Sequence, residues 1–296
     1  MIARTSGSAA TAGSRGVALT APARPLREWI GWLTSRGSAA GRARYAEHLR
    51  QQWERRELAR LEQLPRYQPS VTDVTGQRLE LVDGPSFGGT YREIYRQGIY
   101  AFRPSAPRPY IIDGGANIGM SVLYWKRLAP ASEIVAFEPD PAIFAVLERN
   151  VRAAGHRDVR LVPRALWSAD TTLSFLADGA DGGRVAQEGE GTVRVETARL
   201  RDYLDRPVEL LKLDIEGAET EVLQDCADRL SAVARLYVEY HSLRGQRQLL
   251  PDLLALLRDA GFRLHVQSSG VAPQPFLEGR DHPELDLQLH VFGVRE

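Results

Sequence analysis

Three features are scarce in this chain of 296 residues: cysteine, lysine and long apolar stretches. The single cysteine, Cys226, excludes an internal disulfide framework and any metal cage built from several cysteines. No uninterrupted apolar run approaches the roughly 20 residues needed to span a bilayer, so we expect a soluble protein without membrane insertion. The single thiol fits a reducing compartment, and we expect the protein to be cytoplasmic. Lysine occurs only at Lys126 and Lys212 among 38 basic residues, a bias that we attribute to a GC-rich genome rather than to a binding function.

A net charge of one sign is absent as well. The 38 basic and 38 acidic residues cancel, so no overall field attracts the chain to nucleic acid or to anionic lipid. Hydrophobic residues make up 43% of the chain and charged residues 26%, which is typical of a globular protein. The length suits one large domain with an extension.

The N-terminal part of the chain differs in composition from the rest. Residues 1–27 are rich in Ala, Ser, Gly and Thr, with no acidic residue and no apolar core of a secretory signal. This favours a disordered leader over an organelle transit peptide. We expect residues 28–105 to form a helical and hairpin extension on the substrate side. The pattern of residues 42–63 predicts an amphipathic helix that packs on its own domain or forms a homodimer contact. Two short apolar runs on either side of Gly76 predict a hairpin, and the pattern of residues 91–102 predicts a helix followed by an extended stretch.

From about residue 106 to 296, short apolar runs alternate with helical segments. This alternation is typical of a doubly wound α/β domain with a mostly parallel sheet. The segment 171–197 departs from it, because two strand-like runs flank a loop dense in Gly, Asp and Glu, which indicates an inserted hairpin. The expected strands of the sheet are YIID (110–113), EIVAFE (133–138), VRLV (159–162), LLKLD (210–214), RLYVEYH (235–241), FRLHV (262–266) and LDLQLHVFGV (285–294).

The most informative segment is YIIDGGANIG, in which an apolar strand ends in an aspartate and a glycine-rich turn leads into a helix. Gly114 and Gly115 permit a tight turn and close approach of a ligand to the backbone, and the helix that opens at Gly119 offers free N–H groups. Glu138 ends the next strand, where an acid in such folds accepts hydrogen bonds from ribose hydroxyls. A glycine turn with an unrelated surface acid is the simpler alternative, but the order of the five features favours a nucleoside site.

A nicotinamide dinucleotide is the first rival for this site. Its fingerprint, G-x-G-x-x-G, fails in both frames, because the third position is Ala116 counted from Gly114 and Asn117 counted from Gly115. The acid that closes the strand, Asp113, is also foreign to that fingerprint. A nucleoside ligand without a pyrophosphate fits better, which disfavours a nucleotide-dependent oxidoreductase.

Four segments together resemble the FkbM-type S-adenosyl-L-methionine-dependent methyltransferases: DGGANIG, AFEPDP, LLKLDIEGAE and VEYH. The resemblance covers about 90–294, and LKLDIEGAE is its most specific part. It implies an α/β class I methyltransferase (Rossmann-like) fold, with a seven-stranded, mostly parallel sheet whose last strand is antiparallel. It also implies methyl transfer to oxygen on sugars and natural products.

The resemblance further implies which residues bind S-adenosyl-L-methionine. Glu138 would take the ribose hydroxyls, and Ala165, after the third strand, would pass near the adenine. Asn117 stands where the broader class I pattern has a middle glycine, a departure that the family tolerates. Asp140 is explained by capping the helix that begins at Pro141. The turn that would cradle the methionine part and the adenosine contains Asp113, Gly114, Gly115, Asn117 and Gly119.

Side chains at the ends of two later strands are candidates for catalysis. Asp214 and Glu216 follow an apolar run, at the carboxyl edge where ligands bind in such sheets, although Glu216 is equally well explained as a complement to the following helix. Glu239 and His241 end the next strand, and period-two alternation puts both on one face. Because an unactivated hydroxyl must lose a proton, we expect Asp214, Glu239 and His241 to surround the acceptor hydroxyl, with His241 as the base.

Two alternatives stay open for these residues. The same three side chains could hold a divalent metal such as Mg²⁺ that lowers the pKa of the hydroxyl, although Mg²⁺ prefers oxygen ligands and water to imidazole. A non-catalytic binding module is the other alternative, and the intact acids at Asp113, Glu138 and Asp214 argue against it. The acceptor, a small molecule or glycan, is expected to contact the hairpin insertion together with Tyr91, Arg92 and Tyr95.

Overall fold

A computed structural model describes residues 39–180, 182–186, 193–269 and 285–295 of the chain. The predicted leader lies outside these described residues. The chain divides into two compact units, Met1–Trp53 and Glu54–Glu296. The described part of the first unit is the beginning of helix α2 (Ala39–Glu62), whose remaining turns belong to the second. Within the described ranges, no helix combines the length and the apolar character needed to cross a bilayer.

Helix α2 and the short sheet that follows it confirm two predictions about the extension. The helix predicted over 42–63 is present, and within the second unit its residues Leu58 and Leu61 are buried in an apolar core. The predicted hairpin is present as β1 (Ser70–Thr72) and β2 (Leu79–Leu81), which pair antiparallel. Burial of these two leucines therefore stabilises the C-terminal part of a helix that otherwise carries many charged side chains.

A seven-stranded sheet in the order β12-β13-β11-β10-β3-β4-β5 forms the centre of the second unit. The five strands from β11 to β5 run parallel, whereas β13 lies antiparallel between β11 and β12. This arrangement confirms the predicted sheet with an antiparallel last strand. The bounds of its strands are β3 (Tyr110–Gly114), β4 (Glu133–Phe137), β5 (Arg160–Val162), β10 (Leu210–Leu213), β11 (Arg235–Leu243), β12 (Arg263–Ser268) and β13 (Leu285–Val294).

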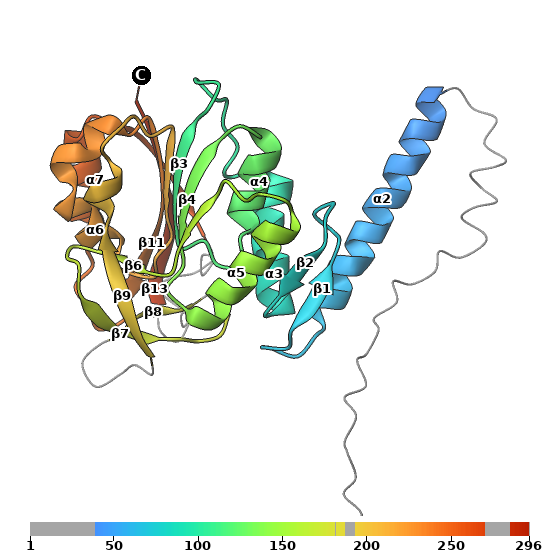
Figure 1. The fold of residues 1–296 in the computed structure, drawn as a ribbon, viewed down its shortest axis with the longest axis horizontal. Helices are drawn as coiled ribbons and strands as arrows, with labels where there is room; N and C mark the ends of the chain where they lie inside the picture. Colours follow the sequence, from blue (N-terminus) through green and yellow to red (C-terminus); the bar gives the residue numbers. More distant parts are fainter. Residues whose placement is uncertain (1–38, 181, 187–192, 270–284, 296) are drawn as a thin grey trace, which may run out of the picture. The chain divides into compact units, whose positions relative to one another are not determined.

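Helices cover both faces of the sheet (Figure 1), and each face has its own apolar core. Successive residues of a strand point to opposite faces, so Ile111 belongs to one core and Ile112 to the other. Both faces being buried explains why the strands are continuous apolar runs rather than alternating ones. The helices are α4 (Met120–Leu128) and α5 (Pro141–Ala153) on the first face, and α6 (Glu219–Asp225) and α7 (Leu250–Asp259) on the second.

The predicted insertion forms a second sheet of its own, in the order β6-β9-β7-β8. Strands β7 (Thr172–Leu176) and β9 (Val193–Arg199) pair antiparallel, which confirms the hairpin predicted over 171–197. Strands β6 (Ala165–Trp167) and β8 (Arg184–Val185) were not predicted, because two or three residues are too few to show a periodic pattern.

The segment before the sheet differs from its prediction. A helix was expected to begin near 91, but α3 (Gly84–Tyr91) begins earlier, after the capping residue Asp83. Three glycines in this short helix hide it from propensity, because glycine is a poor helix former. It continues directly into one π-helical stretch, η1 (Arg92–Gln97), which ends at the left-handed Gly98. Such stretches are rare and occur frequently at functional sites.

The turn that follows β3 requires glycine at Gly115. Its φ of 77° is in the left-handed region, and a Cβ atom there would lie 1.8 Å from the carbonyl oxygen of Asp214. Gly76, in the β1–β2 turn, also has a positive φ, of 94°, but nothing lies within 4 Å of its hypothetical Cβ. The backbone of the turn after β3 is therefore in direct contact with the backbone after β10, whereas the β1–β2 turn has open space around it.

This difference predicts unequal effects of the same substitution. Gly76→Ala should cost about 1–2 kcal/mol of unfolding free energy, the penalty for a left-handed alanine. Gly115→Ala adds a backbone clash and should cost about 4 kcal/mol or more. Urea unfolding of both variants at neutral pH measures the difference, and equal losses would show that the contact with Asp214 relaxes without cost.

Candidate active site

A cavity of about 500 Å³ opens at the carboxyl ends of β3, β4, β10 and β11. Ligands bind at this edge in open α/β sheets, because the loops that follow the parallel strands all meet there. The cavity lies within the second unit. The predicted site residues that line it are Gly115, Asn117, Glu138, Ala165, Asp214, Glu239 and His241.

The glycine turn forms one wall of the cavity and is held to the end of β4. The backbone N–H groups of Gly115 and Ala116 both donate to the carbonyl oxygen of Phe137, at 3.1 and 2.8 Å. Asn117 has a left-handed φ of 47°, and its backbone N–H donates to Glu138 at 3.0 Å. Its side-chain amide donates to the carbonyl oxygen of Ala180, in the inserted segment, at 2.8 Å. Asn117 thus joins the turn to the insertion, a contact that glycine could not make.

Glu138 is a buried carboxylate at the cavity wall. One oxygen accepts the N–H of Asn117 and the other the N–H of Asp140, at 2.9 Å, so each has one lone pair left. Burial raises the pKa of Glu138 to about 7, against the lowering effect of these two hydrogen bonds. Glu138 is therefore an oriented acceptor whose charge changes near neutral pH.

Three of the predicted cofactor residues lie behind the cavity wall rather than in it. Asp113 is 0% exposed, does not line the cavity, and accepts a hydrogen bond from Ser121 at 2.5 Å. Gly114 and Gly119 pack against leucine side chains, where a Cβ would come within 3 Å of them. Their direct contact with a cofactor stays a prediction, and in this structure they support the turn.

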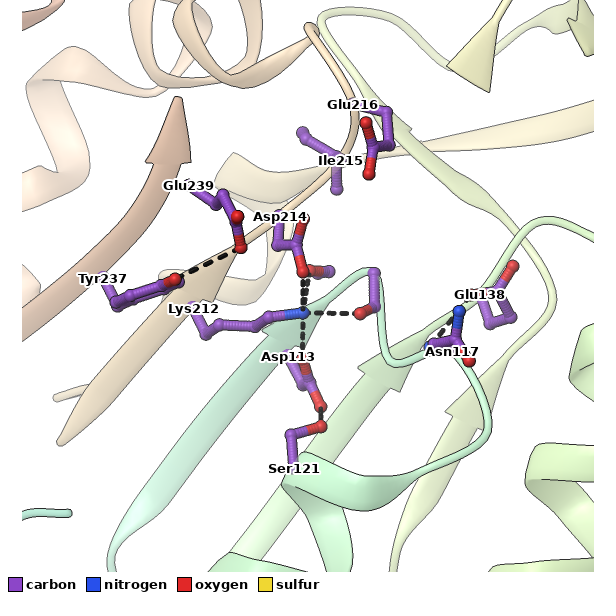
Figure 2. Close-up of polar contacts among 12 residues, drawn as sticks. Asp113, Asn117, Ser121, Glu138, Lys212, Asp214, Ile215, Glu216, Tyr237 and Glu239 are labelled. Carbon is purple, nitrogen blue, oxygen red and sulfur yellow. Dashed lines mark hydrogen bonds and ion pairs between the residues drawn. The ribbon is translucent and has the colours of Figure 1, made fainter. Parts of the chain in front are cut away.

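Lys212 is a site residue that the sequence reasoning missed. The residue is 2% exposed, and its ammonium group donates to the carbonyl oxygens of Gly114 and Gly115 at 3.1 and 2.5 Å. It also forms ion pairs with Asp113 and Asp214, each at 3.3 Å. Figure 2 shows this group at the centre of the site, with contacts to β3, to the glycine turn and to the end of β10.

The scarcity of lysine was the signal that could have found this residue. The only other lysine, Lys126, is equally buried and donates to the carbonyl oxygen of Ser132 at 2.7 Å and to Asp158 at 2.8 Å. Both positions need a compact ammonium with three donors, which a planar guanidinium cannot replace. In a chain that otherwise uses arginine, each retained lysine marks a buried charge.

His241 is held between two carboxylates. Its Nδ1 lies 3.0 Å from Glu219, and its Nε2 lies 3.5 Å from Glu216. Burial would lower the pKa of His241, but Glu216 and Glu219 outweigh burial and raise it well above the ordinary value. Glu219 also accepts the backbone N–H groups of Ile215 and Gly217, so it fixes both the imidazole and the turn after β10. This environment favours the imidazolium form at neutral pH.

The carboxyl groups of Asp214 and Glu216 both have raised pKa values. Burial raises the pKa of Asp214 to about 6, with Lys212 opposing the shift. Burial likewise raises the pKa of Glu216, while the neighbouring His241 opposes the shift, and Glu216 adopts an unusual left-handed φ of 56°. Asp214 is thus the cavity carboxylate whose pKa lies a little below neutral pH.

Glu239 has a different environment from the one predicted. It lies opposite His290 in the β11–β13 register, 3.4 Å from it, and accepts hydrogen bonds from Gln288 and, at 3.2 Å, from Tyr237. Burial would raise the pKa of Glu239, but His290 and His241 outweigh it and lower the pKa to about 2. The antiparallel last strand therefore brings Gln288 and His290 to the site, which only the strand register could reveal.

The structure changes the predicted metal set. Among the described residues, the side chains that could hold a metal ion are Asp214, Glu216 and His241, whose ligand atoms all lie within 4.8 Å of one another. Glu216 takes the place predicted for Glu239, because Glu239 accepts hydrogen bonds from Gln288 on β13 and from Tyr237 (Figure 2 shows the contact with Tyr237). Two carboxylates and one imidazole suit a divalent cation, but Lys212 already supplies a positive charge 3.3 Å from Asp214.

The residues expected to contact the acceptor from the extension face elsewhere. Tyr91 donates to the buried Glu54 at 2.5 Å, and Arg92 pairs with Glu62. Tyr95 donates to the carbonyl oxygen of Met120 at 3.3 Å. None of the three lines the cavity, so this prediction is wrong. The extension does reach the cavity, through other side chains that include Glu93 and Tyr100.

The strand order and the position of the cavity define a class I methyltransferase fold. Comparison with known sequences agrees with this fold, since the family model described as the methyltransferase FkbM domain matches residues 113–264. The chain belongs to the FkbM methyltransferase family. This confirms the resemblance found in the four segments and gives no support to the oxidoreductase alternative.

Three curated relatives show the range of similarity. The chain is 32% identical over 225 residues to "Methyltransferase sdnD" of Sordaria araneosa, covering 63% of this chain and 86% of the relative. It is 30% identical over 212 residues to "31-O-demethyl-FK506 methyltransferase FkbM" of Streptomyces tacrolimicus, covering 58% and 80%. It is 26% identical over 157 residues to "2-O-methyltransferase NoeI" of Sinorhizobium fredii, covering 45% and 64%.

The Lys212 network predicts a specific pattern of stability. Lys212→Met leaves the buried Asp113 without its cation and should lower the unfolding free energy by about 3–5 kcal/mol. The double variant Lys212→Met/Asp113→Asn removes both charges and should recover most of that loss. Lys126→Met is the matched control, because its partner Asp158 is 66% exposed and can be hydrated. Urea unfolding of the four proteins measures this, and a double variant no more stable than Lys212→Met would contradict the pairing.

Proposed function

We propose that this chain is an S-adenosyl-L-methionine-dependent O-methyltransferase. The observation that carries the proposal is the orientation of Glu138, whose two oxygens are each held by one backbone N–H and each keep a lone pair. Two ribose hydroxyls need such a pair of acceptors. The left-handed turn at Gly115 and Asn117 brings the backbone to the same wall, and Ala165 lines the cavity beyond Glu138, where an adenine ring would lie.

The acceptor is proposed to be a hydroxyl of a sugar or a secondary metabolite. The printed names of two relatives specify methyl transfer to oxygen, in one case on FK506. Residues of the inserted sheet and of the extension line the cavity. Substitutions in such peripheral segments can change the contacts with an acceptor while the central seven-stranded sheet stays the same.

Asp214 is the proposed acceptor of the hydroxyl proton. S-adenosyl-L-methionine, when bound, supplies a methyl group on a sulfonium that is already a strong donor, so the chain mainly orients the acceptor and removes a proton. A base works best with a pKa near the working pH, and the pKa of Asp214, about 6, meets this condition. His241, predicted to be the base, is held as an imidazolium by Glu216 and Glu219 and in this proposal positions the acceptor oxygen. Glu239, with a pKa of about 2, stays a fixed negative charge.

A metal-free mechanism is preferred over one with Mg²⁺. If a divalent ion were bound, Asp214, Glu216 and His241 would hold it, and it would lower the pKa of the acceptor hydroxyl. The ammonium of Lys212 and the imidazolium of His241 already place two positive charges beside Asp214 and Glu216. Adding a divalent ion would require His241 to lose its proton first.

The cofactor proposal predicts binding of S-adenosylhomocysteine that depends on Glu138 and on pH. Glu138→Gln should weaken binding by about 1–3 kcal/mol, because one ribose hydroxyl loses its acceptor. Ribose hydroxyls favour the ionised carboxylate, so wild-type affinity should fall several-fold as the pH drops from 8 to 6, through the pKa of about 7. Glu138→Gln should show no such slope. Isothermal titration measures both effects, and an absence of binding by wild-type protein would overturn the cofactor assignment.

The catalytic proposal predicts how turnover responds to Asp214 and to chelation. Asp214→Asn should lower methyl transfer by roughly 10²–10⁴-fold while S-adenosylhomocysteine binding survives. Wild-type turnover should rise with pH through about 6, as Asp214 ionises. A panel of sugar and secondary-metabolite alcohols, assayed by release of S-adenosylhomocysteine, provides the measurement. Loss of activity in a chelator, with recovery on adding Mg²⁺, would favour the metal mechanism, and cofactor binding without turnover of any alcohol would favour the binding module.

A further inference from the structure

Glu93 is a cavity carboxylate with no hydrogen-bond or ion-pair partner in the described part of the chain, although His290 attracts it at longer range. It lies on the π-helical η1, in the extension that precedes the family match at 113–264. Its side chain lines the cavity and is partly buried, and it makes no hydrogen bond or ion pair with any residue that the structure describes. A carboxylate that lines a cavity without a hydrogen bond or ion pair from the protein is free to bind a positively charged ligand group through charge-assisted hydrogen bonds.

Every other carboxylate that lines the cavity already has a partner. Asp83, Glu138, Asp140 and Asp178 each accept backbone N–H groups. The remaining three are paired with side chains: Asp214 with Lys212, Glu216 with His241, and Glu239 with Gln288 and Tyr237. Glu93 is therefore the one lining carboxylate, among the described residues, that is left for a positively charged ligand group.

The position of Glu93 relative to Glu138 is informative. Glu138 ends β4, on one side of β3, whereas β10 and β11 lie on the other side. Glu93 lines the same cavity as Asp214, which follows β10, and Glu239, which lies on β11. Burial and repulsion by Glu239 and Asp214 raise the pKa of Glu93, whereas attraction by His290 on β13 lowers it. Two residues further along η1, Tyr95 donates to the carbonyl oxygen of Met120, the first residue of the helix that follows the glycine turn. The charged groups near Glu93 thus belong to β11, to β13 and to the end of β10, whereas Glu138 follows β4 on the other side of β3.

We propose that Glu93 binds the α-ammonium group of the methionine tail of S-adenosyl-L-methionine. This inference rests on the proposed function, in which Glu138 binds the ribose. A cofactor whose ribose lies at Glu138 extends its tail across the turn toward β10, where its ammonium meets the free carboxylate. Asp113, which the family resemblance assigns to the methionine part, is turned away from the cavity and paired with Lys212. The extension outside the family match therefore completes the cofactor site.

Ligand truncation tests this assignment without any acceptor. The probes are S-adenosylhomocysteine, its analogue that lacks only the α-amino group, and 5′-methylthioadenosine, which lacks the whole amino-acid tail. Glu93→Gln should weaken S-adenosylhomocysteine binding by about 10- to 100-fold, as expected for the loss of a charge-assisted hydrogen bond. Affinity for the deaminated analogue and for 5′-methylthioadenosine should stay within about twofold of wild type, because neither carries the ammonium.

Two further variants separate this role from general effects. Glu138→Gln should weaken all three ligands alike, because all three contain the ribose. Glu133→Gln removes the same charge from an exposed ion pair with Arg108, away from the cavity, and should change none of them. Isothermal titration at pH 7.5 gives the affinities, and thermal unfolding shows that each variant is folded.

The outcomes distinguish failure of this inference from failure of the proposed function. An unchanged affinity of Glu93→Gln for S-adenosylhomocysteine would overturn the assignment, while the cofactor site at Glu138 stands. Equal losses for all three ligands would also overturn it, because they would indicate a disturbed cavity. If wild-type protein binds none of the nucleosides, the proposed function itself fails.

Discussion

The ammonium group of Lys212 is the contact on which the site depends. It donates to the carbonyl oxygens of Gly114 and Gly115 in the glycine turn. It also forms ion pairs with Asp113, at the end of β3, and with Asp214, after β10. One positive charge thereby compensates two carboxylates in a region from which water is largely excluded. Without it, the end of β3, the turn and the end of β10 would each carry unpaired polar groups at the same point.

Around this centre, the acidic side chains have distinct charge states although they lie on adjacent strand ends. Burial raises the pKa values of Asp214 and Glu216, whereas His290 and His241 keep Glu239 ionised. Environments that push pKa values apart allow neighbouring carboxylates to take different chemical roles. In the proposed reaction, Asp214 accepts a proton while Glu239 remains a fixed charge.

The extension before the sheet is part of this site rather than an appendage to it. The family match begins at Asp113, yet side chains from α3 and η1 line the cavity together with those of the sheet. The π-helical stretch provides Glu93, the lining carboxylate for which no hydrogen-bond or ion-pair partner is found among the described residues. An extension of this kind can adapt the site to its ligands while the sheet and its turns stay unchanged.

Most of the fold could be predicted from local pattern. The buried strands were continuous apolar runs, helix α5 had its capping Asp140 and Pro141, and the antiparallel last strand followed from the family resemblance. These features are visible because periodicity, capping and turn chemistry act over a few neighbouring residues. Short elements such as β6, β8 and the glycine-containing α3 escaped, since they have too few residues or the wrong propensity to signal themselves.

For the site, the sequence by itself determined which residues stand at the strand ends: Asp113, Glu138, Asp214, Glu239 and His241. Only the tertiary structure decided what each one contacts. It turned Asp113 inward onto Lys212, turned Glu239 toward His290, placed Glu216 and Glu219 on either side of His241, and left Glu93 facing the cavity. The physical reason is that charge state and partner choice depend on burial and on groups distant in the chain, which strand register and packing bring together, whereas alternation along one strand specifies only the face on which a side chain lies.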